Sequence, residues 1–198
     1  MAALWNHPEL GKFKYLGFGW VNFVTVPAFK SFSYDTGCGN TRRSRGQYEL
    51  AFEADNEEDV PSPAAVALVK KILTNQVDLV QKVIAAIWDD FNGRGPGSDN
   101  WWYGELDKVA ESIDAEGPLL NADALLEVMQ LTFITIYKEA PGRECTMAEL
   151  NFNAVFEPEH GVGVLTDGEN ILGIGYCSDV TTFERYQKDL PEAHGSDE

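Results

Sequence analysis

One short segment of the chain combines side chains that can carry out acid–base chemistry. Glu157, Glu159 and His160 lie within four residues, and two carboxylates beside an imidazole can bind a metal or transfer a proton. No second histidine follows at a spacing of two or four residues, as a metal motif would have it. One interpretation is a hydrolase or metal-dependent enzyme using these three residues. The other is a polar β-turn built on Pro158 and Gly161.

Motifs for nucleophilic catalysis, metal binding or phosphate binding do not occur elsewhere in the sequence. No serine lies in a G-x-S-x-G elbow, and the three cysteines show no C-x-x-C spacing. Cys177 is expected to be buried or inert. We therefore predict no metal and no cofactor, and a non-enzymatic function rather than an enzyme.

Four glycines near the end of the chain lie inside expected strands: Gly161, Gly163, Gly173 and Gly175. A phosphate-binding loop needs its glycines at a strand-to-helix turn, so these glycines are assigned to packing. Asp167-Gly168 predicts a two-residue hairpin turn, which would place Gly163 opposite Leu172.

Two further groups of residues are candidates for binding. Trp101 and Trp102 could form an aromatic platform beside a ligand pocket between sheet and helices, or simply pack at the edge of the core. A small-ligand-binding domain would need a pocket of roughly 300 Å³ or more. Glu57, Glu58 and Asp59 belong to an acidic linker, which is either a solvated connection or a docking surface.

Charge narrows the choice of partner. The 198 residues carry a net charge of −17, so the field of the protein repels nucleic acid and anionic membrane surfaces. The excess of acid either keeps the protein in solution or attracts a basic protein partner. Both interpretations of the charge stay open at this point, and so does the oligomeric state.

The elements that would position these residues follow a strand–helix–strand order. Ser62-Pro63 begins a long amphipathic helix that ends at Phe91, with Thr74-Asn75 as a point where it would divide in two. A second helix is expected from Ser98 or Asp99 and a short one from Asn121 to about Met129. Strands are predicted over residues 12–18, 20–29, 47–53, 131–137, 150–156, 162–165 and 171–176. The fold class is α+β, an antiparallel sheet formed by N- and C-terminal strands and covered on one face by the central helices.

The domain organisation is expected to be simple. Residues 1–188 form a single α+β domain, and residues 189–198 form a flexible acidic tail. No apolar run approaches ~18 residues and no signal peptide begins the chain, which favours a cytoplasmic protein.

The C-terminal residues resemble those of a known group of proteins. Phe156-Glu157-Pro158-Glu159-His160-Gly161-Val162-Gly163-Val164, followed by Ile171-Leu172-Gly173-Ile174-Gly175-Tyr176, is similar to the ending of a bacterial family of unknown function. The loop at residues 35–46 and the Trp101-Trp102 insertion depart from that family. The resemblance implies no enzyme activity, but some similar proteins are thought to act as immunity proteins encoded beside toxins. We therefore expect a cytoplasmic interaction protein, immunity-like, that binds a basic protein.

Overall fold

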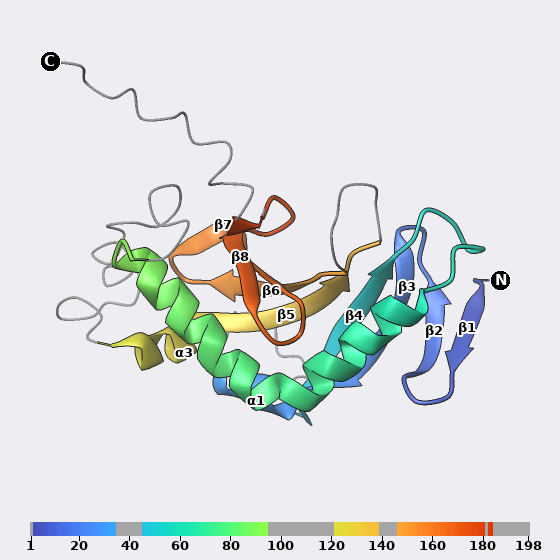
Figure 1. Ribbon diagram of the computed structural model, residues 1–198, viewed down its shortest axis with the longest axis horizontal. Coiled ribbons are helices and arrows are strands. Elements are labelled where there is room, and N and C mark those ends of the chain that lie inside the picture. The colour runs from blue at the N-terminus through green and yellow to red at the C-terminus, as the bar shows by residue number, and fades with distance from the viewer. Residues whose placement is uncertain (1, 35–44, 95–120, 139–145, 181, 184–198) are drawn as a thin grey trace, which may run out of the picture.

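An eight-stranded sheet forms the body of the protein in the computed structural model, which describes residues 2–34, 45–94, 121–138, 146–180 and 182–183 (Figure 1). Each strand lies beside the next one along the chain. All neighbouring pairs are antiparallel except β4 and β5, which are parallel. The strands are β1 (Leu4–His7), β2 (Gly11–Tyr15), β3 (Gly19–Thr25), β4 (Gln47–Glu53), β5 (Met129–Ile136), β6 (Ala148–Ala154), β7 (Glu157–Thr166) and β8 (Ile171–Tyr176).

The prediction of an antiparallel sheet was wrong, because β4 and β5 are parallel. The N- and C-terminal strands do share one sheet, but it is mixed, and the described residues are largely sheet with one long helix. The cause is helix α1 (Pro63–Phe91), whose 29 residues span about 44 Å and cross one face of the sheet (Figure 1). A connection through such a helix returns the chain to the end of the sheet where β4 began, so β5 runs in the same direction.

Helix α1 begins and ends where its sequence predicts. The Ser62 side chain accepts a hydrogen bond from a backbone N–H of the first turn, and Gly93 follows the last turn with a φ of +65°. The helix does not divide at Thr74-Asn75, which corrects that expectation. The Thr74 hydroxyl donates to a carbonyl one turn earlier, and the Asn75 side chain donates to the carbonyl of Gly168 at 3.0 Å. Both polar side chains therefore have partners that leave the helix intact.

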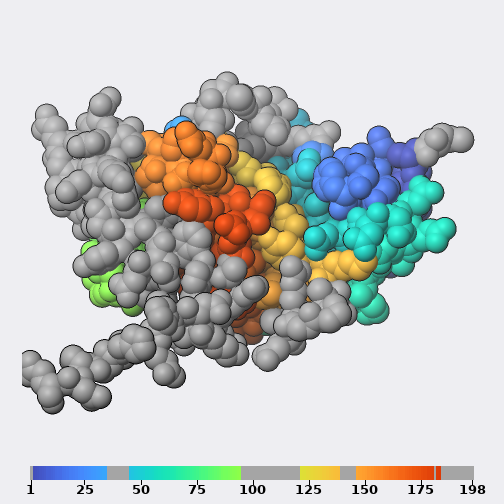
Figure 2. All heavy atoms as spheres, turned by 90° about the horizontal axis from the view of Figure 1, so that it is seen from above, coloured from blue at the N-terminus to red at the C-terminus, as the bar shows by residue number. Residues whose placement is uncertain are grey.

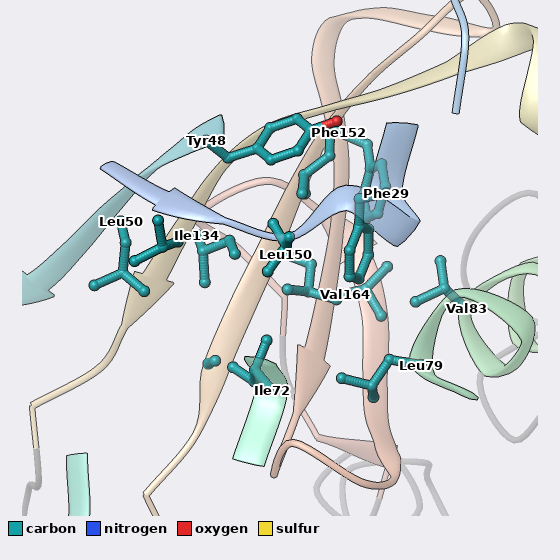
Figure 3. Packing of buried hydrophobic residues seen from close by; sticks show 14 of the residues in the cluster. Phe29, Tyr48, Leu50, Ile72, Leu79, Val83, Ile134, Leu150, Phe152 and Val164 are labelled. Atoms are coloured by element: carbon teal, nitrogen blue, oxygen red, sulfur yellow. The ribbon is translucent and has the colours of Figure 1, made fainter. Parts of the chain in front are cut away.

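The buried stripe of α1 lies partly on other residues than those that a repeated three- and four-residue spacing of apolar side chains indicates. On that spacing, Leu73 is only partly buried and Val77 is 70% exposed. Ile72 and Leu79, one heptad apart, carry the stripe past it on the opposite side of the helix. Figure 3 shows Leu79 and Val83 of α1 reaching toward Val164 and the neighbouring strands, where the core is formed.

Shorter elements complete the described structure. A 3₁₀-helix η1 (Pro27–Ser31) follows β3, and η3 (Ala122–Ala124) with α3 (Leu125–Val128) fulfils the prediction of a short helix before β5. The second helix expected from Ser98 or Asp99 lies outside the described residues. Within the described ranges, no helix has the length and apolarity that a membrane crossing requires.

The β7–β8 hairpin has a different register from the expected one. Its loop spans residues 167–170, and the Asp167 carboxylate accepts backbone N–H bonds from Glu169 and Asn170 at 2.9 and 2.7 Å. This wider turn moves Gly163 from Leu172 to a position opposite Gly175.

Candidate functional site

Glu157, Glu159 and His160 lie at the start of β7 rather than in a turn on Pro158 and Gly161. The turn before β7 is formed by residues 155 and 156. His160 Nδ1 lies 2.9 Å from Glu157 Oε1, with its ring 4.9 Å from that of Tyr176. Glu159 is exposed and has no described contact with His160. The structure thus brings together one carboxylate and one imidazole at the surface.

A metal centre would need more than this pair. Across the residues that the structure describes, no three His, Cys, Asp or Glu side chains are grouped closely enough to hold a metal ion. Trp101 and Trp102, the other binding candidates, lie outside the described residues.

The acidic linker forms an ordered surface loop that we call the acidic patch. It comprises Glu53 at the end of β4 and the loop residues Asp55, Glu57, Glu58 and Asp59 between β4 and α1. Three exposed apolar residues, Leu16, Phe18 and Val60, also belong to it. In the space-filling view, the cyan and teal spheres of this part of the chain lie at the surface beside the blue N-terminal strands (Figure 2).

Hydrogen bonds fix the loop against the sheet. The Trp20 indole donates to the carbonyl of Asp59 at 2.9 Å, and the Ala54 N–H donates to the carbonyl of Phe18 at 3.3 Å. Within the loop, the Glu58 N–H donates to the Asn56 side chain at 2.9 Å. The acidic patch therefore has a defined shape before any partner arrives.

One lysine neutralises part of the acidic patch. Lys138 Nζ lies 2.6 Å from carboxylate oxygens of both Asp55 and Asp59. Hydrogen bonds to these two groups raise the pKa of the Lys138 ammonium above its usual range, and the bond from Lys138 lowers the pKa of Asp59. Glu57 and Glu58 are exposed and make no ion pair with any described residue, so their charges remain open to a partner.

The apolar part of the acidic patch was not predicted from the sequence. The exposed fractions are 59% for Phe18, 46% for Leu16 and 55% for Val60. Phe18 and Leu16 lie in the β2–β3 turn, where polar residues are usual. That departure from ordinary turn composition is the signal that could have revealed them.

A second cluster, which was not predicted from the sequence, is buried where β6 and β7 pair. Glu149 of β6 is 1% exposed, accepts a hydrogen bond from the Ser178 N–H at 2.8 Å, and accepts another from the Tyr137 hydroxyl. Burial raises the pKa of Glu149, against the lowering effect of these bonds. A Cβ atom on Gly163 would lie 2.6 Å from Glu149 Oε1, so the glycine makes room for the carboxyl group.

Cys177 borders the same cluster and is held in its thiol form. Burial, and then the charge of Glu149, raises the pKa of Cys177 from 9.0 to about 12. At pH 8 the thiolate fraction in the folded protein is therefore about a thousandfold lower than in the unfolded chain.

We expect a variant carrying Cys38→Ser and Cys145→Ser to react with a thiol reagent about a thousandfold more slowly in native buffer than in urea. The measurement is the rate of reaction with an aromatic disulfide reagent at pH 8. A native rate within tenfold of the unfolded rate would contradict the burial of the thiol.

The comparisons with known proteins place the chain in a family. No curated protein and no solved structure matches the chain. A family described as "Domain of unknown function (DUF6985)" matches residues 11–181, which extend from β2 to just past β8. The match includes both the acidic patch and the Glu149 cluster, and the chain belongs to this family of unknown function.

Proposed function

We propose that the chain is a non-enzymatic interaction protein that binds a basic protein partner through the acidic patch. The observation that carries the proposal is the order of the loop: Glu57 and Glu58 are exposed on a segment that bonds from Trp20 and Ala54 hold in place. A preorganised loop loses little conformational entropy on binding. The electrostatic attraction of the loop for a basic surface therefore contributes to the binding free energy with little offset from ordering the loop.

The apolar members of the acidic patch support a protein partner over a small cation. Interfaces place large apolar side chains at the centre and charged groups at the rim. Phe18, Leu16 and Val60 supply the apolar part, and the glutamates supply the charge. The partner in this proposal presents lysine and arginine around an apolar side chain or hollow.

The resemblance to immunity-like bacterial proteins suggests the biological setting. In this proposal the partner is a basic toxin, such as a nuclease, encoded beside the gene for this chain and neutralised in the bacterial cytoplasm. The net charge of −17 supports this choice because it favours encounter with a basic protein.

The proposal is tested by selecting peptides from a random display library against the full chain. We expect the selected peptides to combine lysine or arginine with an apolar residue, and to bind more weakly as salt is raised. A variant with Glu57→Lys and Glu58→Lys should lose about tenfold or more in affinity, and Phe18→Ser about tenfold.

A matched control separates the acidic patch from net charge. Asp123 of η3 and Glu127 of α3 are exposed, so Asp123→Lys with Glu127→Lys makes the same change in total charge at another surface. This control should bind nearly as well as the wild type. Equal losses in the two double variants, or selected peptides without basic residues, would refute the proposal.

A further inference from the structure

Strand β1 lies at one end of the sheet, and one side of its backbone faces no other strand of the described structure (Figure 1). The Tyr15 N–H of β2 donates to the Ala3 carbonyl at 3.1 Å, which sets the hydrogen-bonding pattern between β1 and β2. Bonds to one neighbour alternate along an antiparallel strand, so Trp5 bonds toward β2 while the N–H and C=O groups of Leu4 and Asn6 point away from it. These two residues therefore form an open edge, which another strand can join.

The side chains of β1 suit contact with a further strand. Leu4 is 54% exposed on the face of the sheet that α1 does not cover. Trp5 faces the core from the opposite side of the strand and is half-buried, with its ring centroid 5.0 Å from that of Phe13 and 5.8 Å from that of Phe52. The row of aromatic rings across the core face thus ends at a tryptophan that still has open surface.

We propose that two copies of the chain join through β1 in antiparallel orientation and form one continuous sheet. With the twofold axis beside Trp5, Leu4 of each copy lies opposite the partner's Asn6, and each of these pairs exchanges both N–H···O bonds. Trp5 then faces the partner's Trp5 at the position without hydrogen bonds, where side chains of neighbouring strands come closest. The open backbone groups and the half-buried ring therefore find their partners in the same register.

Charge favours this edge over other surfaces for contact between two copies. The net charge of −17 makes two copies repel each other, but β1 and β2 contain no carboxylate and carry only Lys12 and Lys14. The acidic patch lies toward the Leu4 end of β1, because Lys14 pairs with Leu4 and the β2–β3 turn that holds Phe18 follows directly. Antiparallel pairing places the two acidic patches at opposite ends of the contact between the β1 strands. The dimer therefore adds a second surface to the proposed function and does not depend on it.

The first test is sedimentation equilibrium of the untagged full chain from micromolar to millimolar concentration. Strand β1 has only four residues and Pro8 follows it, so the contact is small and we expect a dimer that dissociates on dilution. Added salt should strengthen this dimer by screening the repulsion between copies, whereas salt weakens the binding of a basic peptide to the acidic patch. A chain that stays monomeric at millimolar concentration, in both low and high salt, would be inconsistent with the proposal.

Amide hydrogen exchange then locates the contact. Where about nine-tenths of the chains are dimeric, exchange at Leu4 and Asn6 should be about tenfold slower than in the monomer, because their N–H groups are bonded only in the dimer. Trp5 and His7, which already bond toward β2, serve as internal controls and should change less. Unchanged exchange at Leu4 and Asn6 would mean that the dimer forms through another surface, contrary to the proposal.

An exchange of charges separates loss of the contact from loss of folding. One variant carries Leu4→Lys with Asn6→Lys and another carries Leu4→Glu with Asn6→Glu, all at exposed positions. Each alone should dimerise about tenfold more weakly than the wild type, and an equal mixture should recover dimers because lysine then lies opposite glutamate. Glu57→Gln with Glu58→Gln, which matches the net charge of the lysine variant, should dimerise at least as tightly as the wild type. A lysine variant that dimerises like the wild type, or a mixture that does not recover, would overturn the proposal.

Discussion

Replacing Gly161 by alanine is expected to destabilise the protein by about 2–5 kcal/mol. Gly161 has a φ of +67°, a left-handed conformation that costs an L-residue about 1–2 kcal/mol. A Cβ atom there would also lie 2.5 Å from the carbonyl oxygen of Phe152 on the paired strand β6. Relieving that contact requires the backbone of one strand to move, and overpacking of this kind costs about 1–3 kcal/mol. Urea denaturation of both proteins measures the difference.

Gly17 provides a matched control for the backbone contribution. Its φ is +91°, and a Cβ atom there would meet no heavy atom within 4 Å. Gly17→Ala should therefore lose only about 1–2 kcal/mol, the cost of the conformation alone. If the two alanine variants were equally destabilised, the close approach of Gly161 to β6 would have no energetic effect.

The second large effect concerns the buried carboxyl group of Glu149. Burial raises its pKa above the ordinary 4.5, so the folded protein holds this proton more tightly than the unfolded chain does. The contribution of Glu149 to stability is therefore fully present below about pH 4.5, and it is lost as pH rises through the folded pKa. Glu149→Gln removes the titrating group but keeps an acceptor oxygen for the Ser178 N–H. We expect the variant to melt at a higher temperature than the wild type at pH 8, with no such gain in acid.

Tyr137→Phe tests the same mechanism in the opposite direction. The Tyr137 hydroxyl donates to Glu149 and lowers its pKa, so its removal should extend the decline in stability to higher pH. Thermal melts of the three proteins between pH 4 and pH 9 give the comparison. A difference between Glu149→Gln and wild type that did not vary with pH would mean that this carboxyl group titrates normally.

Local signals in the sequence predicted the elements better than their arrangement. Ser62-Pro63 and Asn92-Gly93 determine the ends of α1 through capping and backbone conformation, which involve only neighbouring residues. The four-residue strand β1 (Leu4–His7) was missed because two of its residues are polar and no run of alternation marks it. The parallel pairing of β4 and β5 depends on the path of α1 over the sheet, which periodicity does not encode.

The candidate site residues show the same difference between what local sequence predicts and what depends on the arrangement of the strands. Glu57, Glu58 and Asp59 were identified from charge alone, but the exposed Phe18 beside them depends on a turn that is distant in sequence. Glu149 resembles an ordinary solvent-facing residue between two core positions of a strand. Its burial arises because β7 supplies a glycine where any side chain would collide with the carboxyl group.

The parallel pair of β4 and β5 also has a consequence for the order of events in folding. Strands β1 to β4 form one antiparallel meander and strands β5 to β8 another, each built largely from contacts close in sequence. The two meanders meet at the β4–β5 pair, and forming that pair closes a loop of residues 54–128. The chain entropy lost on closing this loop must be overcome before the contacts between β4 and β5 form. We therefore expect two early-forming halves and a slow step in which α1 brings them together.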